Sequence, residues 1–235
     1  MSVIPQIRKL GGITLDLLFP KSCVGCGREG KFICDVCRSR MIKIGTLLCP
    51  RCGRPQINGI LCSDCINWHS NIDGIRSPFR FEGTIRKAVH QLKYKNIRAM
   101  APDLAELMFE YLINNPIPVE VLVPVPLHPK RLRERGYNQA ELLGKALGKL
   151  LAIPVETEIL ARKKYSPPQA KTTSVEQRRR NMADAFICKG NGLQGCRILL
   201  VDDVATSATT LDACAKALKE SGTASVWGLV LAREV

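Results

Sequence analysis

The second half of the chain alternates short apolar runs with stretches in which apolar residues recur every three or four positions. The first pattern is typical of buried strands and the second of amphipathic helices. Strands are predicted over 77–81, 120–126, 197–201 and 225–232, and helices over 84–95, 99–113, 138–151 and 210–221. Because the strands are almost wholly apolar, we expect an α/β fold, a mainly parallel sheet with helices on both faces.

Residues 23–65 follow neither pattern. Large apolar residues are too few here to form a core of their own. Eight of the eleven cysteines lie in this part, in the C-x-x-C pairs Cys23/Cys26, Cys34/Cys37, Cys49/Cys52 and Cys62/Cys65. We therefore expect an N-terminal helix over 1–22, a cysteine-rich module over 23–70 and the α/β domain over 71–235. Since the α/β domain has its own apolar strands, we expect it to stay folded when the module unfolds.

The cysteine pairs indicate metal binding. Two thiolates three positions apart can bind one Zn²⁺ from a tight turn, and two such pairs complete a tetrahedral site. Each half of the module contains a pair, a Gly-Arg turn, an apolar residue and a second pair. This repeat favours two structural zinc ions per chain, one in each half. A cross-braced pairing of the first and third pairs is the alternative. Metal binding would supply the folding free energy that the module lacks.

The N-terminus lacks the continuous apolar stretch and cleavage site of a signal peptide, so we expect a cytoplasmic protein. In that compartment thiols stay reduced, which disfavours disulfides between the paired cysteines. The remaining cysteines, Cys188, Cys196 and Cys214, are expected to be buried thiols. No apolar run approaches the ~20 residues of a membrane span.

The net charge of +14 is concentrated in two blocks. Residues 1–76 carry +6, from 11 basic and 5 acidic side chains, and residues 128–180 carry +8, from 13 basic and 5 acidic side chains. Such blocks indicate a polyanionic partner, either nucleic acid or a phosphate-rich small molecule. A basic protein without an anionic partner is the alternative. Aromatic residues make up only 5% of the chain, which disfavours an extended surface for stacking bases.

The most informative stretch runs from Ile198 to Leu211. An apolar strand ends in Asp202 and Asp203, and a loop of hydroxyl-bearing and small residues leads into a helix. At the carboxyl end of a parallel strand this arrangement suits a phosphorylated ribose, because loop amides would face the phosphate and carboxylates would bind the sugar hydroxyls. The stretch contains neither G-x-x-x-x-G-K-[ST] nor G-x-G-x-x-G. Simple capping of the helix by the two acids is the alternative interpretation.

Residues 201–211 resemble the phosphoribosyl-pyrophosphate (PRPP) motif of type I phosphoribosyltransferases. The chain as a whole resembles the ComF family, competence-associated proteins with an N-terminal double zinc ribbon. Besides the cysteine pairs and the 201–211 motif, the match is carried by residues 123–140, Pro167–Gln169 and Arg178–Asn181. The resemblance implies a type I phosphoribosyltransferase-like domain joined to the zinc module. It also implies PRPP or another 5′-phosphoribosyl ligand, with Mg²⁺ as its companion ion.

The resemblance further implies roles for individual residues. Asp202 and Asp203 match the acids that hold the ribose hydroxyls. The 5′-phosphate loop comprises Thr206, Ser207, Ala208, Thr209 and Thr210. The pyrophosphate loop matches Val125 and Pro126, with Lys130 and Arg131 near enough to neutralise its ligand. Residues 169–180 match the mobile stretch that closes over the site.

Two positions depart from relatives of this fold. Ala208 stands where the loop usually has glycine, which allows a positive φ and a close approach of the backbone to phosphate. Purine-salvage members carry an Asp where this chain has Thr206, so purine salvage is not expected. No catalytic residue is assigned, and the sequence leaves open whether PRPP is turned over.

Two functions fit these features. The first is a competence-associated protein that supports DNA uptake and natural transformation, and that contacts single-stranded DNA or the uptake or recombination proteins. Its candidate DNA contacts are Arg131, Arg133, Arg135, Arg178, Arg179 and Arg180, with Tyr137 and Tyr165 as candidates for base stacking. The alternative is an active phosphoribosyltransferase on an unidentified acceptor. A zinc-dependent hydrolase is disfavoured, because His69, His90 and His128 lie outside metal-ligand spacing and a Cys₄ site has no open position.

Overall fold

The computed structural model describes residues 21–163, 182 and 184–235. Nearly all of the helix expected over 1–22 lies outside the described residues, as do Tyr165 and the whole 169–180 stretch with its three arginines at 178–180. Within the described part of the chain, no helix is both long and apolar enough to cross a membrane.

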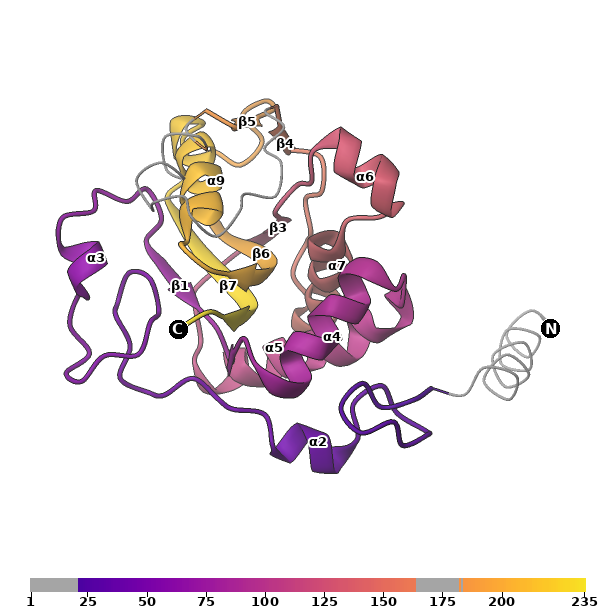
Figure 1. Cartoon of the computed structure of the whole chain (residues 1–235). Coiled ribbons are helices and arrows are strands. Elements are labelled where there is room, and N and C mark those ends of the chain that lie inside the picture. The colour runs from indigo at the N-terminus through magenta and orange to yellow at the C-terminus, as the bar shows by residue number, and fades with distance from the viewer. Residues whose placement is uncertain (1–20, 164–181, 183) are drawn as a thin grey trace.

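The main sheet is parallel throughout, as the apolar strands predict (Figure 1). Its strands are β1 (Gly74–Arg76), β2 (Phe79–Arg80), β3 (Val121–Pro124), β6 (Arg197–Ala205) and β7 (Ser225–Arg233). Their order is β1-β7-β6-β3, and β2 follows β1 along the same side of β7. A separate antiparallel hairpin consists of β4 (Leu160–Arg162) and β5 (Phe186–Cys188).

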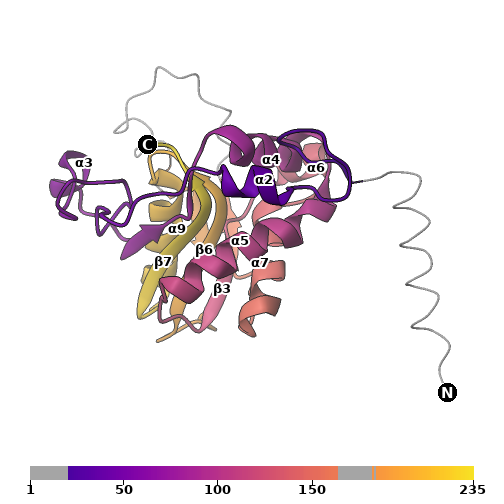
Figure 2. The same cartoon turned by 90° about the horizontal axis from the view of Figure 1, so that it is seen from below.

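Helices cover both faces of the sheet. They are α2 (Asp35–Ser39), α3 (Ser63–Ile66), α4 (Gly83–Tyr94), α5 (Ala101–Asn114), α6 (Pro129–Arg135), α7 (Gln139–Leu151) and α9 (Thr209–Glu220), with a 3-10 turn at Arg98–Met100. Successive residues of a strand point to opposite faces. Ile198 and Leu200 of β6 therefore pack with α9, whereas Leu199 and Val201 pack with α4, α5 and α7 (Figure 2). This two-layered core confirms the expected α/β fold.

Strand β6 is longer than the apolar run predicts. It continues through Asp202 and Asp203 to Ala205, because β7 runs alongside it as far as the pair Ala205–Arg233. The two acids therefore lie within the last part of the strand and not beyond its end.

Three further features were not predicted. Residues 129–135 form α6, which begins at a proline after the cap residue His128 and ends at Gly136 with φ 78°. Strand β1 and the β4–β5 hairpin were also missed, since three-residue strands carry too little pattern. Of the three unpaired cysteines, Cys214 is buried as expected, but Cys188 and Cys196 are only half-buried.

The two halves of the cysteine-rich module lie against opposite faces of the sheet. We call residues 21–41 the first ribbon and residues 47–68 the second ribbon. Phe32, Ile33 and Met41 of the first ribbon pack with α4 and α5. The four cysteines of the second ribbon and Trp68 belong to the same apolar cluster as α9, β6 and β7. The second ribbon therefore shares an apolar cluster with the sheet, and independent folding of the α/β domain stays a prediction.

Candidate ligand and metal sites

A cavity opens where β3 and β6 separate at their carboxyl ends. Pro124 of β3 pairs with Val201, after which β3 turns away while β6 continues to Ala205. The split leaves a cavity of about 470 Å³ at the edge of the sheet where parallel strands of α/β proteins bind ligands. Asp202, Asp203, Thr206, Ser207, Thr209 and Thr210 all line it, as do Val125, Pro126 and Arg131.

The two acids have different surroundings. Asp203 is buried, and its Oδ1 lies 2.8 Å from the Lys93 Nζ on α4. Its Oδ2 is buried without a hydrogen-bond partner in the described structure. Asp202 is less enclosed, and its Oδ1 accepts a hydrogen bond of 2.8 Å from the Asp203 backbone N–H. Asp203 thus offers an acceptor that a ligand hydroxyl would satisfy.

Burial and the neighbouring Asp203 charge raise the pKa of Asp202 to about 7, against the opposing effect of Lys93. Burial alone would lower the pKa of Lys93, but the charges of Asp203 and Asp202 raise it above its ordinary value. Lys93 therefore remains a cation at neutral pH and neutralises Asp203. Sequence reasoning missed Lys93, because it lies more than a hundred positions before the acids.

The loop after β6 has the shape of an anion-binding turn. Ala208 has φ 63° and ψ −2°, the left-handed conformation that glycine adopts without strain. It immediately precedes α9, whose first-turn amides have no acceptor within the helix. The hydroxyl oxygens of Ser207 and Thr209 lie 2.8 Å apart. The loop therefore keeps a glycine-like conformation although alanine costs about 1–2 kcal/mol there.

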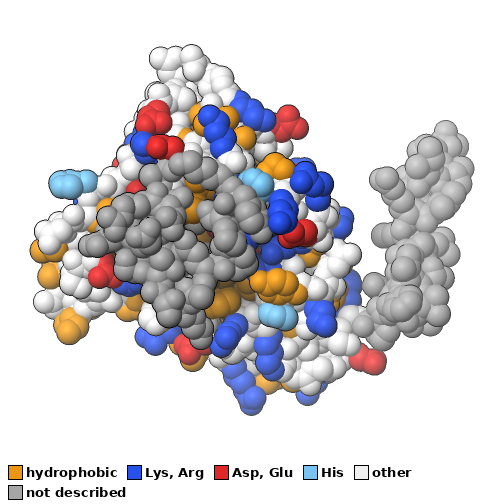
Figure 3. Space-filling view, turned by 45° about the horizontal axis from the view of Figure 1, so that its top comes forward, with side chains coloured by type: hydrophobic (Ala, Val, Ile, Leu, Met, Phe, Trp, Pro, Cys, Tyr) orange, Lys and Arg blue, Asp and Glu red, His pale blue; other side chains and the backbone are white. Residues whose placement is uncertain are grey.

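Basic side chains surround the cavity from three elements. Arg131 on α6 and Arg162 on β4 line it, together with Lys93 on α4. Arg131 was predicted, whereas Arg162 and the cavity residue Gln139 were not. Lys130 is exposed and does not line this cavity. A space-filling view shows Lys and Arg side chains gathered beside the part of the chain that is not described (Figure 3).

A second cavity of about 490 Å³ lies beside α6. Arg135 lines it with Lys93 and Arg131, so the two cavities share a wall. Arg133 is exposed and lines neither of them. The arginines at 178–180 lie outside the described residues, so their position relative to α6 remains a prediction.

The aromatic residue expected to stack with bases is not available for that role. Tyr137 is buried, its hydroxyl donates a hydrogen bond to the Leu92 carbonyl, and the Arg98 guanidinium lies 4.4 Å from its ring centre. The exposed ring beside the second cavity is instead Tyr94, with the Arg135 guanidinium 5.7 Å from its centre. Tyr165 lies outside the described residues.

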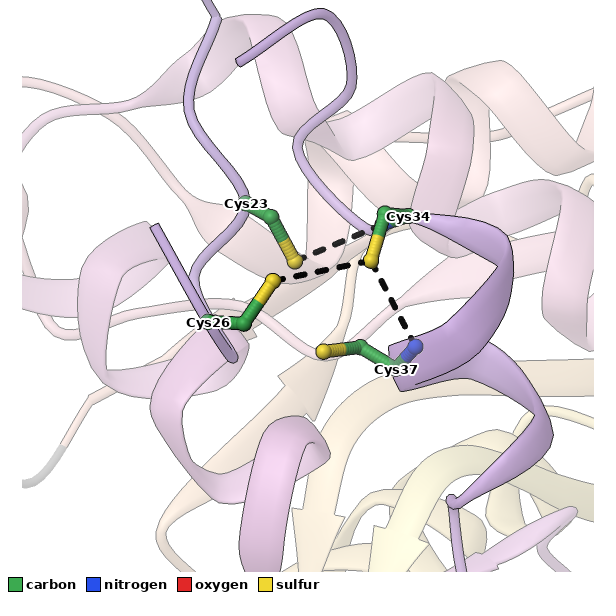
Figure 4. Close-up of side chains that lie close together, drawn as sticks. All are labelled: Cys23, Cys26, Cys34 and Cys37. Carbon is green, nitrogen blue, oxygen red and sulfur yellow. Dashed lines mark hydrogen bonds between the residues drawn. The ribbon is translucent and has the colours of Figure 1, made fainter. Parts of the chain in front are cut away.

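The cysteines form two clusters, each made from two consecutive pairs. Cys23, Cys26, Cys34 and Cys37 form one, with the four sulfurs pointing toward one another (Figure 4), and Cys49, Cys52, Cys62 and Cys65 form the other. In each cluster the sulfurs all lie within 4.8 Å of one another. One ion per half is therefore the correct pairing, and the cross-braced alternative is wrong.

The sulfur geometry fits tetrahedral zinc. The Cys26–Cys34 and Cys52–Cys62 sulfur pairs are each 3.7 Å apart, and four thiolates around Zn²⁺ lie about 3.8 Å from one another. Burial would raise the pKa of Cys23 and Cys49, but backbone N–H groups directed at their sulfurs lower it to about 6. Each cluster thus contains a thiolate at neutral pH, the form that binds metal.

Comparison with known proteins agrees with this geometry. Residues 14–66 match the double zinc ribbon domain, and residues 135–234 match the phosphoribosyl transferase domain. Competence protein ComFC of Bacillus subtilis (strain 168) is 31% identical over 204 residues, which are 82% of this chain and 80% of that protein. This chain belongs to the ComF family. The two domain matches, with the two Cys₄ clusters, indicate a phosphoribosyltransferase fold that carries structural zinc.

Other ComF relatives have similar coverage. DNA utilization protein YhgH of Salmonella typhi is 30% identical over 201 residues, 83% of this chain and 87% of that protein. Competence protein F of Haemophilus influenzae is 30% identical over 197 residues, 78% of this chain and 84% of that protein. Among solved structures, a glutamine PRPP amidotransferase from B. subtilis is similar over 56% of this chain and 26% of its own, with 17% identity and a TM-score of 0.39.

Proposed function

We propose that the cavity at the carboxyl end of β6 binds PRPP or another 5′-phosphoribosyl ligand, in a protein that serves competence and DNA uptake. One observation carries the first half of this proposal: a pair of acids, a hydroxyl-rich anion loop and three cations meet in a single cavity. A ligand with both sugar hydroxyls and phosphates matches that set of groups. The names of the curated relatives support the second half.

Each part of the ligand has a matching part of the cavity. Asp202 and the unpartnered Oδ2 of Asp203 accept from the ribose hydroxyls. The loop from Thr206 to Thr210 holds the 5′-phosphate with its amides and hydroxyls. The pyrophosphate lies along Val125 and Pro126, where Arg131 neutralises it and Lys130 adds charge from the rim. Mg²⁺ accompanies the pyrophosphate, since phosphate oxygens with one or two carboxylates are its usual ligands.

Replacing both acids tests the ligand site. The Asp202→Asn/Asp203→Asn variant should bind PRPP at least 100-fold more weakly in isothermal titration, because hydrogen bonds to charged groups contribute about 1.5–3 kcal/mol each. Glu141→Gln serves as the control, since the Glu141 carboxylate pairs with Lys145 one turn further along α7 and lines neither cavity. Neither acid caps α9, whose cap residue is Ala208, so unchanged PRPP affinity in a folded double variant would contradict the ligand site.

Single-stranded DNA is the proposed macromolecular partner. Arg131, Arg133 and Arg135 lie on one short helix beside both cavities, and the arginines at 178–180 are proposed to extend this surface. The uptake or recombination proteins are the alternative partners of the same surface.

We place the protein in the cytoplasm, where the thiols of both clusters would stay reduced. We also propose that the N-terminal helix ends at residue 22 and that the cysteine-rich module ends at residue 70, where the α/β domain begins.

Salt dependence tests the DNA contact. For an oligonucleotide of mixed sequence, log affinity should fall linearly with log salt, because each phosphate contact releases counterions. Arg133→Ala/Arg135→Ala should reduce the slope by up to about 1.4, about 0.7 per contact. Lys145→Ala is the control, as Lys145 lies on α7 away from α6 and both cavities. Absence of oligonucleotide binding by the wild-type protein at low salt would contradict the DNA contact.

A second candidate function is phosphoribosyl transfer. The left-handed conformation of Ala208 favours it, since alanine here adopts a backbone conformation that glycine adopts readily. In that reaction the bond between C1′ and the pyrophosphate oxygen breaks, a bond from C1′ to the acceptor forms, and pyrophosphate leaves. Release of pyrophosphate that depends on an added acceptor would establish it.

A further inference from the structure

Arg233, the last residue of β7, is a buried arginine. It pairs with Ala205 at the end of β6, and only 1% of its surface is exposed. A guanidinium is charged in proteins and carries five N–H donors, so a buried one needs acceptors and a nearby negative charge. Its Nη2 donates to the Thr206 carbonyl at 3.5 Å. Its Nε and Nη1 have no hydrogen-bond partner in the described structure.

The second ribbon faces these unpartnered groups. Arg233 shares a small cavity with Cys52 and Cys65 of the second cluster and with Ser207 of the 5′-phosphate loop. The cavity has a volume of about 10 Å³, room for at most one water molecule. The cluster and the loop are therefore packed together around Arg233, with no solvent layer between them.

The charge of Arg233 is opposite to that of a zinc-loaded second cluster. A zinc ion with four thiolates carries a net charge of −2, and its sulfurs accept N–H hydrogen bonds that fix the ligands in place. Burial lowers the pKa of Arg233, and Arg54 adds to that effect, while the nearby Cys52, Cys65 and Cys62 oppose it in part. A metal-loaded second cluster thus supplies the counter-charge that the buried guanidinium requires.

We propose that the second zinc cluster holds the 5′-phosphate loop in its binding conformation through Arg233, a positioning residue that lies between the cluster and the Thr206 carbonyl to which its Nη2 donates. Loss of this metal removes the negative charge beside the buried guanidinium, so Arg233 moves and releases Thr206. Affinity for a 5′-phosphorylated sugar then falls. This inference rests on the proposed function for the identity of the ligand, but the link between cluster and loop stands on the shared cavity and the Thr206 hydrogen bond.

Two substitutions of Arg233 test the link. Arg233→Met keeps a long side chain but removes the charge. Arg233→Lys keeps the charge but removes the planar guanidinium with its several N–H donors. Both should release the second zinc to a chelator 10- to 100-fold faster than the wild-type protein, the usual effect of removing an outer partner of metal ligands. Both should also bind ribose 5-phosphate at least tenfold more weakly, with the Lys variant less affected. Amide hydrogen exchange at 206–211 should rise in parallel.

Arg76→Met is the matched control. The Arg76 guanidinium also joins the second ribbon to the sheet, since its Nη1 donates to the Pro50 carbonyl at 3.0 Å, but it does not contact the loop. This variant should leave the affinity for ribose 5-phosphate and the exchange at 206–211 unchanged. If Arg233→Met does not fold, Arg233→Lys and chelation of the wild-type protein give the same readouts.

The outcomes separate the two proposals. Wild-type zinc release and wild-type exchange at 206–211 in the Arg233 variants would overturn the inference. Wild-type protein that binds neither ribose 5-phosphate nor PRPP would overturn the proposed ligand, while zinc release and exchange would still decide whether Arg233 links the cluster to the loop.

Discussion

The first ribbon lies against α4 and α5 on one face of the sheet, and the second lies against β1 and α9 on the other (Figures 1 and 2). Three cysteines of the first ribbon form a small cluster of their own, and Cys26 is exposed. All four cysteines of the second ribbon are buried within the core of the sheet. Two halves that each carry two C-x-x-C pairs thus have different depths of burial.

The polar contacts differ in the same way. The first ribbon has polar contacts at the protein surface, where Lys87 Nζ donates to the Gly25 carbonyl at 3.1 Å and Arg38 pairs with Glu110. The second ribbon is held by the Arg76 side chain and also by a backbone hydrogen bond of 2.8 Å from the Ile75 N–H of β1 to the Arg51 carbonyl. Surface pairs contribute little to stability, whereas buried backbone hydrogen bonds are costly to break. The repeated C-x-x-C pairs therefore determine which residues bind the metal. The neighbouring strands and helices determine how strongly each metal site is coupled to the stability of the α/β domain.

The largest expected difference comes from removing the second cysteine of each ribbon. Cys52→Ser should lower the free energy of unfolding of the whole chain by about 4 kcal/mol or more, since it removes a metal ligand inside the shared core. Cys26→Ser should cost about 1–2 kcal/mol, because water can reach this exposed position and replace the missing thiolate as a ligand. Chemical denaturation followed by circular dichroism measures both values. Equal losses in the two variants would contradict the unequal coupling of the ribbons.

Substituting one glycine in each ribbon should give a smaller difference in stability between the two ribbons. Gly27 and Gly53 occupy the same place after the C-x-x-C pair, with φ of 80° and 71°. A Cβ at Gly27 would meet nothing within 4 Å, whereas one at Gly53 would lie 2.3 Å from the Ile75 carbonyl oxygen. Gly27→Ala should therefore cost about 1–2 kcal/mol for the left-handed backbone alone.

Gly53→Ala should cost the same amount plus about 1–3 kcal/mol for the clash with β1. Because the backbone strain is common to both variants, the difference between their unfolding free energies measures how tightly the second ribbon packs against β1. Similar melting curves for the two variants would mean that the second ribbon can move away from the strand at little cost.

Much of this arrangement follows from local sequence. The cysteine pairs, the long apolar strands and the acid–loop–helix stretch at 198–211 are each contained in a short window, and each was predicted in its correct place. Such features need only neighbours along the chain.

The rest depends on contacts between distant segments. Lys93 reaches Asp203 from α4, and Arg162 reaches the cavity from a three-residue strand, so neither stands in a recognisable motif. Tyr137 follows an exposed glycine, and nothing local indicates that its hydroxyl finds the Leu92 carbonyl. Arg233 ends an apolar strand, where an arginine ordinarily reaches solvent. Its burial arises only because the second ribbon folds over that end of the sheet.

Stepwise withdrawal of zinc from the wild-type protein tests the account most directly. A chelator is added in increments, the metal content is measured, and amide hydrogen exchange is followed in peptides covering 23–37, 49–65 and 206–211. The account predicts that the first zinc leaves from the cluster at 23–37 with no change at 206–211. Departure of the second zinc should then raise exchange at 206–211 by at least about tenfold, a local loss of about 1.4 kcal/mol. Exchange at 206–211 that rises with the first zinc, or that stays slow after both have gone, would contradict it.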